Sequence, residues 1–357
     1  MRLIRACIDT QALRSNLATL RARAPRARVM AVVKANAYGH GLVPVALALG
    51  DADAFAVARI EEATALRAAG VAQPIVLLEG VVSAEQMQAA AELGLELVVH
   101  DALQIALLEC FRGAHRFAVW LKIDTGMNRL GFRVEDFPAA WSRVQALHAR
   151  VLSVRVLTHL ACADDRSNPA NAAQLERFAA LAVGLRVERS IANSAALLGL
   201  PASHTEWVRP GLGLYGLSPF AGQTGADFGL KAVMTLMSTV IAVRDVRRGE
   251  RVGYGGAWTA ARESRIAIIA GGYGDGLLRS LPNGAPVVIA GRRAPLAGRV
   301  SMDMIAVDVT DLPPVRIGAE AELWGTQLPV EEVAAAAGTL PYELVCGVSQ
   351  RVPIELG

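Results

Sequence analysis

The chain has 357 residues, 53% hydrophobic and 19% charged, which is enough apolar mass for one large or two ordinary domains. Its formal net charge is only +3 and its basic residues are scattered, which argues against a nucleic-acid partner or an anionic membrane surface. Four widely spaced cysteines argue against a metal site or a disulfide framework. The absence of a signal-peptide pattern and of a spanning apolar run predicts a cytoplasmic protein.

Strand-like and helix-like segments alternate from the N-terminus to about residue 215. Repeated βα units predict a parallel sheet, and about eight units in about 220 residues favour a closed (β/α)8 barrel over residues 1–228. Helical segments include residues 60–69 and 85–93. Short apolar runs predict the strands at residues 3–8, 29–33, 54–57, 75–78, 95–99, 117–123, 153–157 and 186–192.

Three polar residues stand at the carboxyl ends of predicted strands. They are Lys34, Lys122 and His159. The active site of a (β/α)8 barrel lies at this end of its strands. We therefore expect the three side chains to converge on one site, although a single lysine or histidine at a strand end is usually structural.

The pattern changes at a linker rich in Gly, Ala and Pro, residues 219–230. Short β-rich runs follow at residues 233–243, 266–270, 286–290 and 304–309, separated by turns. Only residues 330–337 retain a helical pattern. We predict a second, mainly β domain over residues 229–357.

The most informative stretch is residues 31–41, Ala-Val-Val-Lys-Ala-Asn-Ala-Tyr-Gly-His-Gly. Burial would lower the pKa of Lys34 and make its amine a nucleophile or a base, whereas a lysine that reaches solvent would be structural. The stretch resembles the pyridoxal phosphate (PLP) attachment motif of the alanine racemase family. The resemblance continues in order along the chain, and it implies that Lys34 carries the cofactor.

Residues 121–132, Leu-Lys-Ile-Asp-Thr-Gly-Met-Asn-Arg-Leu-Gly-Phe, form a second matching block. From the residues alone, Lys122 could simply pair with Asp124. The resemblance implies that Lys122 is carbamylated and orients Arg129, which contacts the cofactor's phenolic oxygen and the substrate carboxylate. A carbamate is an anion, and an anion suits a neighbouring guanidinium.

Two further blocks, residues 191–195 and 206–215, offer a serine at a helix start and a glycine that permits close backbone approach. As bare patterns they are weak. By resemblance, Arg209 faces the pyridine nitrogen, and His159 sits near the ring and helps to hold Arg209. The resemblance assigns the phosphate to Tyr38, Ser194, Gly211, Leu212 and Tyr342.

The predicted β domain carries the remaining matches. Tyr254 lies between glycines in residues 251–258, and the resemblance implies that it is the second catalytic base, entering the partner's site in a head-to-tail homodimer. Tyr273 would line the entrance, and Met302 with Asp303 would contact the substrate's carboxylate end. Gly274 and Ser301 depart from the commoner alanine and cysteine, but neither position carries chemistry. Residues 271–276 are Gly-rich, yet they lack the context of a nucleotide loop.

The resemblance implies a PLP-dependent racemase that interconverts L- and D-alanine, for wall precursors or for alanine breakdown. Lys34 would serve the D-enantiomer and Tyr254 the L-enantiomer, since inversion is simplest with bases on opposite faces. Two alternatives remain. A serine or broad-specificity racemase would keep nearly every residue named above. A non-catalytic PLP-binding barrel would lack the β domain and its tyrosine.

Overall fold

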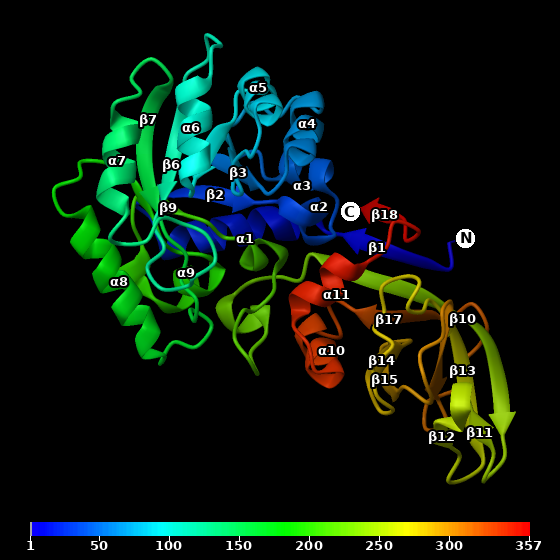
Figure 1. The fold of residues 1–357 in the computed structure, drawn as a ribbon. Helices are drawn as coiled ribbons and strands as arrows, with labels where there is room; N and C mark the ends of the chain where they lie inside the picture. The colour runs from blue at the N-terminus through cyan, green and yellow to red at the C-terminus, as the bar shows by residue number, and fades with distance from the viewer. Residues whose placement is uncertain (1) are drawn as a thin grey trace.

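The computed structural model describes residues 2–357 and has two lobes (Figure 1). The larger lobe is a closed parallel barrel in which β9 returns to pair with β2. This confirms the predicted (β/α)8 barrel. Its strands, in order, are β2 (Arg28–Val32), β3 (Ala54–Val57), β4 (Ile75–Leu77), β5 (Glu96–Val99), β6 (Phe117–Lys122), β7 (Val151–Leu157), β8 (Arg189–Ser190) and β9 (Trp207–Val208).

Helices surround this barrel, and several of them begin at a side-chain cap. Asp9 Oδ1 accepts hydrogen bonds of 2.8 Å from the amides of Gln11 and Ala12, and Ser83 and Asp101 cap two later helices in the same way. The helices of this lobe are α1 (Thr10–Arg23), α3 (Leu42–Ala48), α4 (Ile60–Ala68), α5 (Ala84–Glu92), α6 (Ala102–Cys110), α7 (Phe137–Gln145), α8 (Pro169–Ala182) and α9 (Ser194–Gly199).

The smaller lobe is mainly β, as predicted. Its large sheet has the order β15-β14-β17-β10-β1-β18, and β13 joins β10 to β16. The strands are β1 (Ile4–Ile8), β10 (Met234–Val246), β13 (Ser264–Ala270), β14 (Pro286–Ile289), β15 (Arg292–Pro295), β16 (Met304–Asp308), β17 (Glu320–Trp324) and β18 (Ile354–Leu356), with a separate pair, β11 (Arg251–Val252) and β12 (Trp258–Thr259).

Two helices at the end of the chain, α10 (Val330–Ala337) and α11 (Pro341–Gly347), pack against each other. Helix α11 also contacts the α2 segment (Lys34–Tyr38) at the barrel mouth. The C-terminal part of the chain therefore reaches back to the end of the barrel where β2 stops (Figure 1).

One predicted barrel strand is wrong. Residues 3–8 form a strand, β1, but it pairs with β10 and β18 in the second sheet. Its burial is only partial, with Ala6 and Ile8 inward, whereas every residue of β3 is buried. A barrel strand is covered on both faces, and β1 is not. The strand that completes the barrel is β9, whose two residues, Trp207 and Val208, were too few to give an apolar run.

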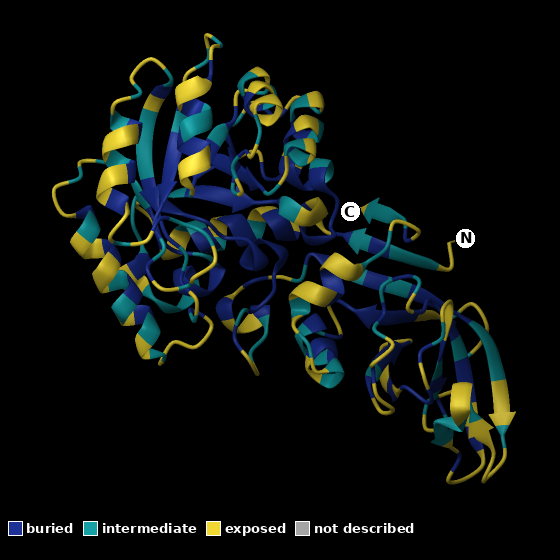
Figure 2. Ribbon diagram, viewed as in Figure 1, coloured by how far each residue is buried: buried dark blue, intermediate teal, exposed yellow. Residues whose placement is uncertain are grey.

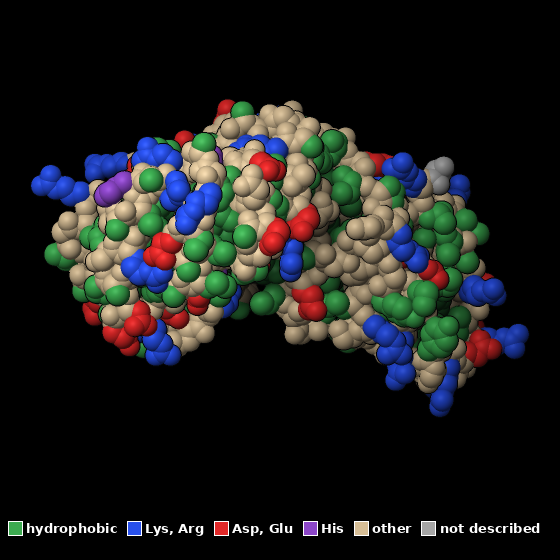
Figure 3. Space-filling model, turned by 45° about the horizontal axis from the view of Figure 1, so that its top comes forward, with side chains coloured by type: hydrophobic (Ala, Val, Ile, Leu, Met, Phe, Trp, Pro, Cys, Tyr) green, Lys and Arg blue, Asp and Glu red, His purple; other side chains and the backbone are tan. Residues whose placement is uncertain are grey.

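Buried residues fill the barrel interior and the sheet of the second lobe, and exposed positions lie on the outward faces of the helices (Figure 2). On the face seen in Figure 3, lysines and arginines are spread over both lobes rather than gathered in one patch. Among residues 2–357, no helix combines the length and apolar character that crossing a membrane would require.

Candidate active site

A cavity of about 470 Å³ opens at the carboxyl ends of the barrel strands. It brings together residues from β2, β6, β7, the start of α9 and the segment after β9, with α11 closing one side. Ten of the fourteen residues predicted for the site line this cavity: Lys34, Tyr38, Lys122, Arg129, His159, Ser194, Arg209, Gly211, Leu212 and Tyr342.

Lys34 stands just beyond β2 and is followed by an unusual turn. Ala35, Asn36, Ala37 and Tyr38 all have φ between 53° and 55°, which is the left-handed region. This conformation costs roughly 1–2 kcal/mol for each residue other than glycine. Four such residues in a row persist only where the surrounding structure holds them, and strain of this kind gathers at functional sites.

The lining of the cavity is strongly cationic. Lys34, Lys122, Arg129 and Arg209 all contribute to it, although the whole chain has only three lysines. Glu79 is the only carboxylate among the lining residues. The cavity is therefore suited to a ligand with more than one negative charge.

Lys122 is one of two strongly perturbed cations in this cavity. It is buried at the end of β6, and desolvation, with the charges of Arg209 and Arg129, lowers the pKa of its amine to about 8. A substantial fraction of the amine is therefore neutral near physiological pH. Asp124, the partner that the sequence offered, accepts instead from the backbone amides of residues 126–128.

Arg209 is fully enclosed and is held by acceptors of its own barrel. Its Nη1 donates to Ser190 Oγ at 2.6 Å, and its Nη2 donates to the carbonyl oxygens of Thr158 at 2.7 Å and Ile191 at 3.2 Å. Burial lowers the pKa of the guanidinium to about 10, so Arg209 remains a cation at neutral pH. The unused N–H groups are available to the cavity that Arg209 lines.

No hydrogen bond joins His159 to Arg209 in the described residues, and the backbone of its neighbour Thr158 holds the guanidinium. The supporting role of His159 stays a prediction. The His159 ring accepts a long hydrogen bond, 3.5 Å, from Asn193. Burial and the charge of Arg209 lower the pKa of His159 to about 2, so its ring is neutral.

A small polar cradle lies where α9 and the segment after β9 meet. Gly211 has no side chain, and a Cβ there would lie 2.4 Å from the Tyr38 hydroxyl oxygen. Ser194 Oγ accepts from the amides of Gly211 and Gly213. Within residues 2–357 the amides of Ser194 and Leu212 donate no hydrogen bond to the protein. Free amides and hydroxyls around a small space suit an anion.

The other four predicted residues lie outside this cavity in the single chain. Tyr254, in a short helical turn, is 68% exposed, and Tyr273 and Met302 are 42% and 51% exposed. The carboxylate of Asp303 pairs with Arg351 at 2.5 Å. Their assignment to the site remains a prediction, because they line no part of the cavity of their own chain.

Several residues that line the cavity were not predicted from the sequence. Glu79 follows strand β4, so the strand-end pattern that singled out Lys34 also applied to it. Leu78, Val98 and Cys346 also line the cavity. Apolar residues and a lone cysteine on a late helix carry no local signal of such a role.

Comparison with known proteins decides the family. Residues 8–219 match the family model of the alanine racemase N-terminal domain, and residues 233–356 match that of the C-terminal domain. The chain belongs to the alanine racemase family. The alanine racemases of Vibrio parahaemolyticus and Aeromonas hydrophila are each 49% identical to it, over 99% and 98% of both chains.

Solved alanine racemase structures have the same fold. The biosynthetic alanine racemase from Pseudomonas aeruginosa superposes with a TM-score of 0.97 at 46% identity, with 100% of both chains covered. The structure of alanine racemase from Bartonella henselae with covalently bound pyridoxal phosphate has a TM-score of 0.89 at 31% identity. The barrel followed by a mainly β domain is thus the architecture of alanine racemases.

Proposed function

We propose that this protein uses PLP to interconvert L- and D-alanine. The observation that carries the proposal is the single cavity at the barrel mouth, where Lys34 and three further cations face a polar cradle. The membership in the alanine racemase family and the name of the Bartonella henselae structure support the choice of cofactor and reaction.

The residues present fit PLP. A phosphate would occupy the cradle, where the hydroxyls of Tyr38 and Tyr342, Ser194 and the free amides would hold it, and where a side chain at Gly211 would intrude. Burial raises the pKa of Tyr342 to about 12, so its hydroxyl keeps its proton and can donate. Lys34 would hold the aldehyde carbon covalently, and Arg209 would face the pyridine nitrogen.

The chemistry divides between the cofactor and the protein. Bound PLP would withdraw electrons from the substrate and so weaken its Cα–H bond. Arg129, oriented by Lys122 as a carbamate, would hold the alanine carboxylate. The substrate amine would replace Lys34 on the aldehyde carbon. The Lys34 amine released by this exchange would take or return the Cα proton on one face, which we assign to D-alanine. Racemisation then requires a second proton donor and acceptor on the opposite face.

We assign this second role, for L-alanine, to the partner subunit's Tyr254. Tyr254 lies in the second lobe, is exposed, and does not line the cavity of its own chain. Tyr273, Met302 and Met304 are also exposed, and exposed apolar side chains of this size favour an interface. A head-to-tail homodimer would bring the partner's Tyr254 to Lys34.

The two family matches also support a division of the chain into two domains near residue 229. The two family matches stop at residue 219 and resume at residue 233. We propose residues 229–357, together with the first strand β1, as the domain that supplies Tyr254, and the barrel as the domain that would bind PLP.

A substrate panel tests the proposed reaction. The purified protein should be incubated with PLP and with each enantiomer of alanine and serine, and the products separated by chiral chromatography. Alanine should be racemised with a clearly higher kcat/KM than serine. A preference for serine, or equal rates for many amino acids, would identify another racemase. Bound PLP without any turnover would identify a non-catalytic PLP-binding protein.

A further inference from the structure

The left-handed turn of residues 35–38 joins two parts of the proposed site. Lys34 precedes it, and Tyr38, whose hydroxyl lies at the phosphate cradle, ends it. The geometry of this turn therefore sets the relative backbone positions of Lys34 and Tyr38, from which the reacting amine and the phosphate hydroxyl extend. None of its four left-handed residues is glycine, so contacts from elsewhere in the chain must hold it.

Glu62, in the first turn of α4, holds the start of this turn. Its Oε1 accepts a 2.6 Å hydrogen bond from the amide of Ala35, the residue directly after Lys34. Its Oε2 accepts from the amides of Ala58 and Arg59, at 2.9 and 3.1 Å. One carboxylate thus ties the Lys34–Ala35 peptide to the segment that follows strand β3. A cap of α4 alone would need only the second set of bonds.

His40 holds the other end. It is fully buried, and its Nδ1 lies 2.8 Å from the carbonyl oxygen of Tyr38 and 3.1 Å from that of Ala37. Both neighbours are acceptors, so Nδ1 must carry the proton. Burial lowers the pKa of His40 to about 4, so the ring is neutral, and Nε2 has no partner in the described residues.

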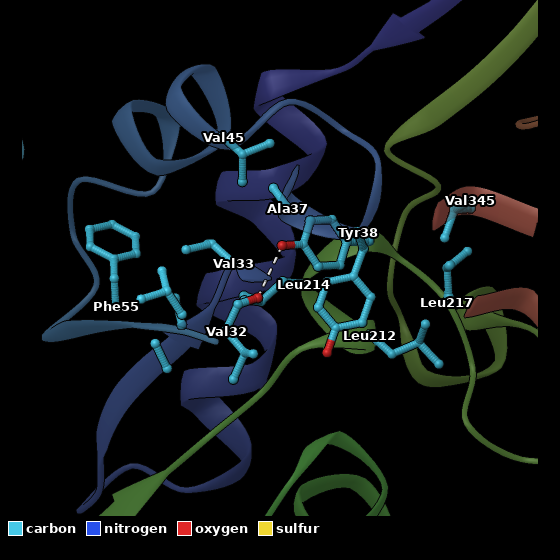
Figure 4. Close-up of a cluster of buried hydrophobic side chains, with 14 of the residues drawn as sticks. Val32, Val33, Ala37, Tyr38, Val45, Phe55, Leu212, Leu214, Leu217 and Val345 are labelled. Carbon is cyan, nitrogen blue, oxygen red and sulfur yellow. Dashed lines mark hydrogen bonds between the residues drawn. The ribbon is translucent and has the colours of Figure 1, made fainter. Parts of the chain in front are cut away.

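Aromatic rings connect His40 to strand β2, which ends shortly before Lys34. The His40 ring lies 4.5 Å from that of Tyr215, which in turn stacks on Tyr38 at 4.8 Å. The Tyr215 hydroxyl donates to the carbonyl oxygen of Val32, near the end of β2. Figure 4 shows Tyr38 among buried hydrophobic side chains that include Val32 and Leu212.

We infer that Glu62 and His40 are positioning residues that hold the left-handed turn and so set where the Lys34 amine lies. Neither lines the cavity, so each acts through the turn and not on the substrate. This role rests on the proposed function of Lys34. It predicts that loosening the turn slows the reaction more than it weakens substrate binding.

The test uses Glu62→Gln with Glu61→Gln as its matched control. Glu61 is the neighbouring residue of α4, is exposed, and its carboxylate bonds to nothing in the described residues. Glutamine at position 62 has one acceptor oxygen and cannot serve both sets of amides. In Glu62→Gln, kcat for alanine should fall by about 10- to 100-fold while KM changes by less than about 3-fold. Glu61→Gln should leave both values unchanged.

Amide hydrogen exchange of the PLP-free protein gives a readout that does not depend on turnover. In Glu62→Gln the peptide covering residues 34–41 should exchange at least about 10-fold faster than in the wild type. If faster exchange is confined to residues 58–66 and kcat matches the Glu61→Gln control, Glu62 is only a helix cap and the inference is wrong.

A second pair of variants tests His40. If Glu62→Gln does not fold, this pair still tests whether contacts to the turn of residues 35–38 position Lys34. His40→Asn keeps an N–H donor near the position of Nδ1, whereas His40→Leu removes it. The asparagine variant should retain a higher kcat and slower exchange over residues 34–41 than the leucine variant. Equal behaviour of the two would overturn the role of His40. A wild-type protein without racemase activity would refute the proposed function. The hydrogen-exchange results would still show whether Glu62 and His40 hold the turn.

Discussion

The hydroxyl oxygen of Tyr38 lies so close over Gly211 that a Cβ atom at position 211 would be 2.4 Å from it. Gly211→Ala should therefore displace Tyr38 from the phosphate cradle. Overpacking of this kind costs about 1–3 kcal/mol, which corresponds to roughly 5- to 150-fold in the Kd for PLP if the cost falls on the bound state. Titration of the PLP-free protein by fluorescence measures this loss. Gly50→Ala is the control, because its Cβ would meet only Leu47 O at 3.5 Å. Equal PLP affinities of the two variants would argue against the cradle.

Lys34 should be the attachment point of the cofactor. Two of the chain's three lysines line the cavity, so the choice between Lys34 and Lys122 is a real one. Borohydride reduction of the PLP-loaded protein, followed by peptide mass analysis, should find the pyridoxyl group on Lys34. An adduct on Lys122 or on Lys231, which lies outside this cavity, would show that the assignment is wrong.

Lys122 should carry a carbamate, with an occupancy that rises with pH. Only the neutral amine reacts with CO2, giving a carbamate and a proton, and burial lowers the pKa of Lys122 to about 8. Occupancy at a fixed CO2 concentration should therefore increase from pH 6.5 to pH 8.5. NMR with ¹³C-bicarbonate should show one carbamate signal, which Lys122→Ala removes and Lys231→Ala keeps.

The Lys122→Ala variant adds an independent check on the same residue. It should lose activity because Arg129 loses the anion that orients it, and small added carboxylates should restore part of the activity. A ¹³C spectrum without the signal at either pH would refute the modification, and full activity of Lys122→Ala would refute its role.

Tyr254 should act in the site of the partner subunit. Tyr254→Phe alone should lower kcat by about 100-fold or more, the usual contribution of a general acid or base. Mixing Lys34→Ala and Tyr254→Phe chains after dissociation should restore about a quarter of the wild-type activity, since random pairing makes half the dimers mixed and each has one complete site. If mixed dimers form without activity, Tyr254 does not act across the interface.

The sequence predicted most barrel strands because each is a short apolar run, but it could not predict strand pairing. The apolar run at residues 3–8 predicts a barrel strand, but β1 pairs with β10, which is far away in the chain. Trp207 and Val208 complete the barrel and are too few to recognise. Site residues were predictable where they lie within a local sequence motif, as Lys34 does in residues 31–41. The contacts of Glu62 and His40 with the turn at residues 35–38 depend on tertiary structure and leave no pattern in the sequence.

The central claim is that this protein racemises alanine, and chiral chromatography of a single reaction tests it most directly. The purified protein with PLP should be given pure L-alanine in one vessel and pure D-alanine in another. Both should reach the same equal mixture of enantiomers, because enantiomers have equal free energies, and Lys34→Ala should leave both unchanged. A wild-type protein that binds PLP and leaves both enantiomers unconverted would contradict the account.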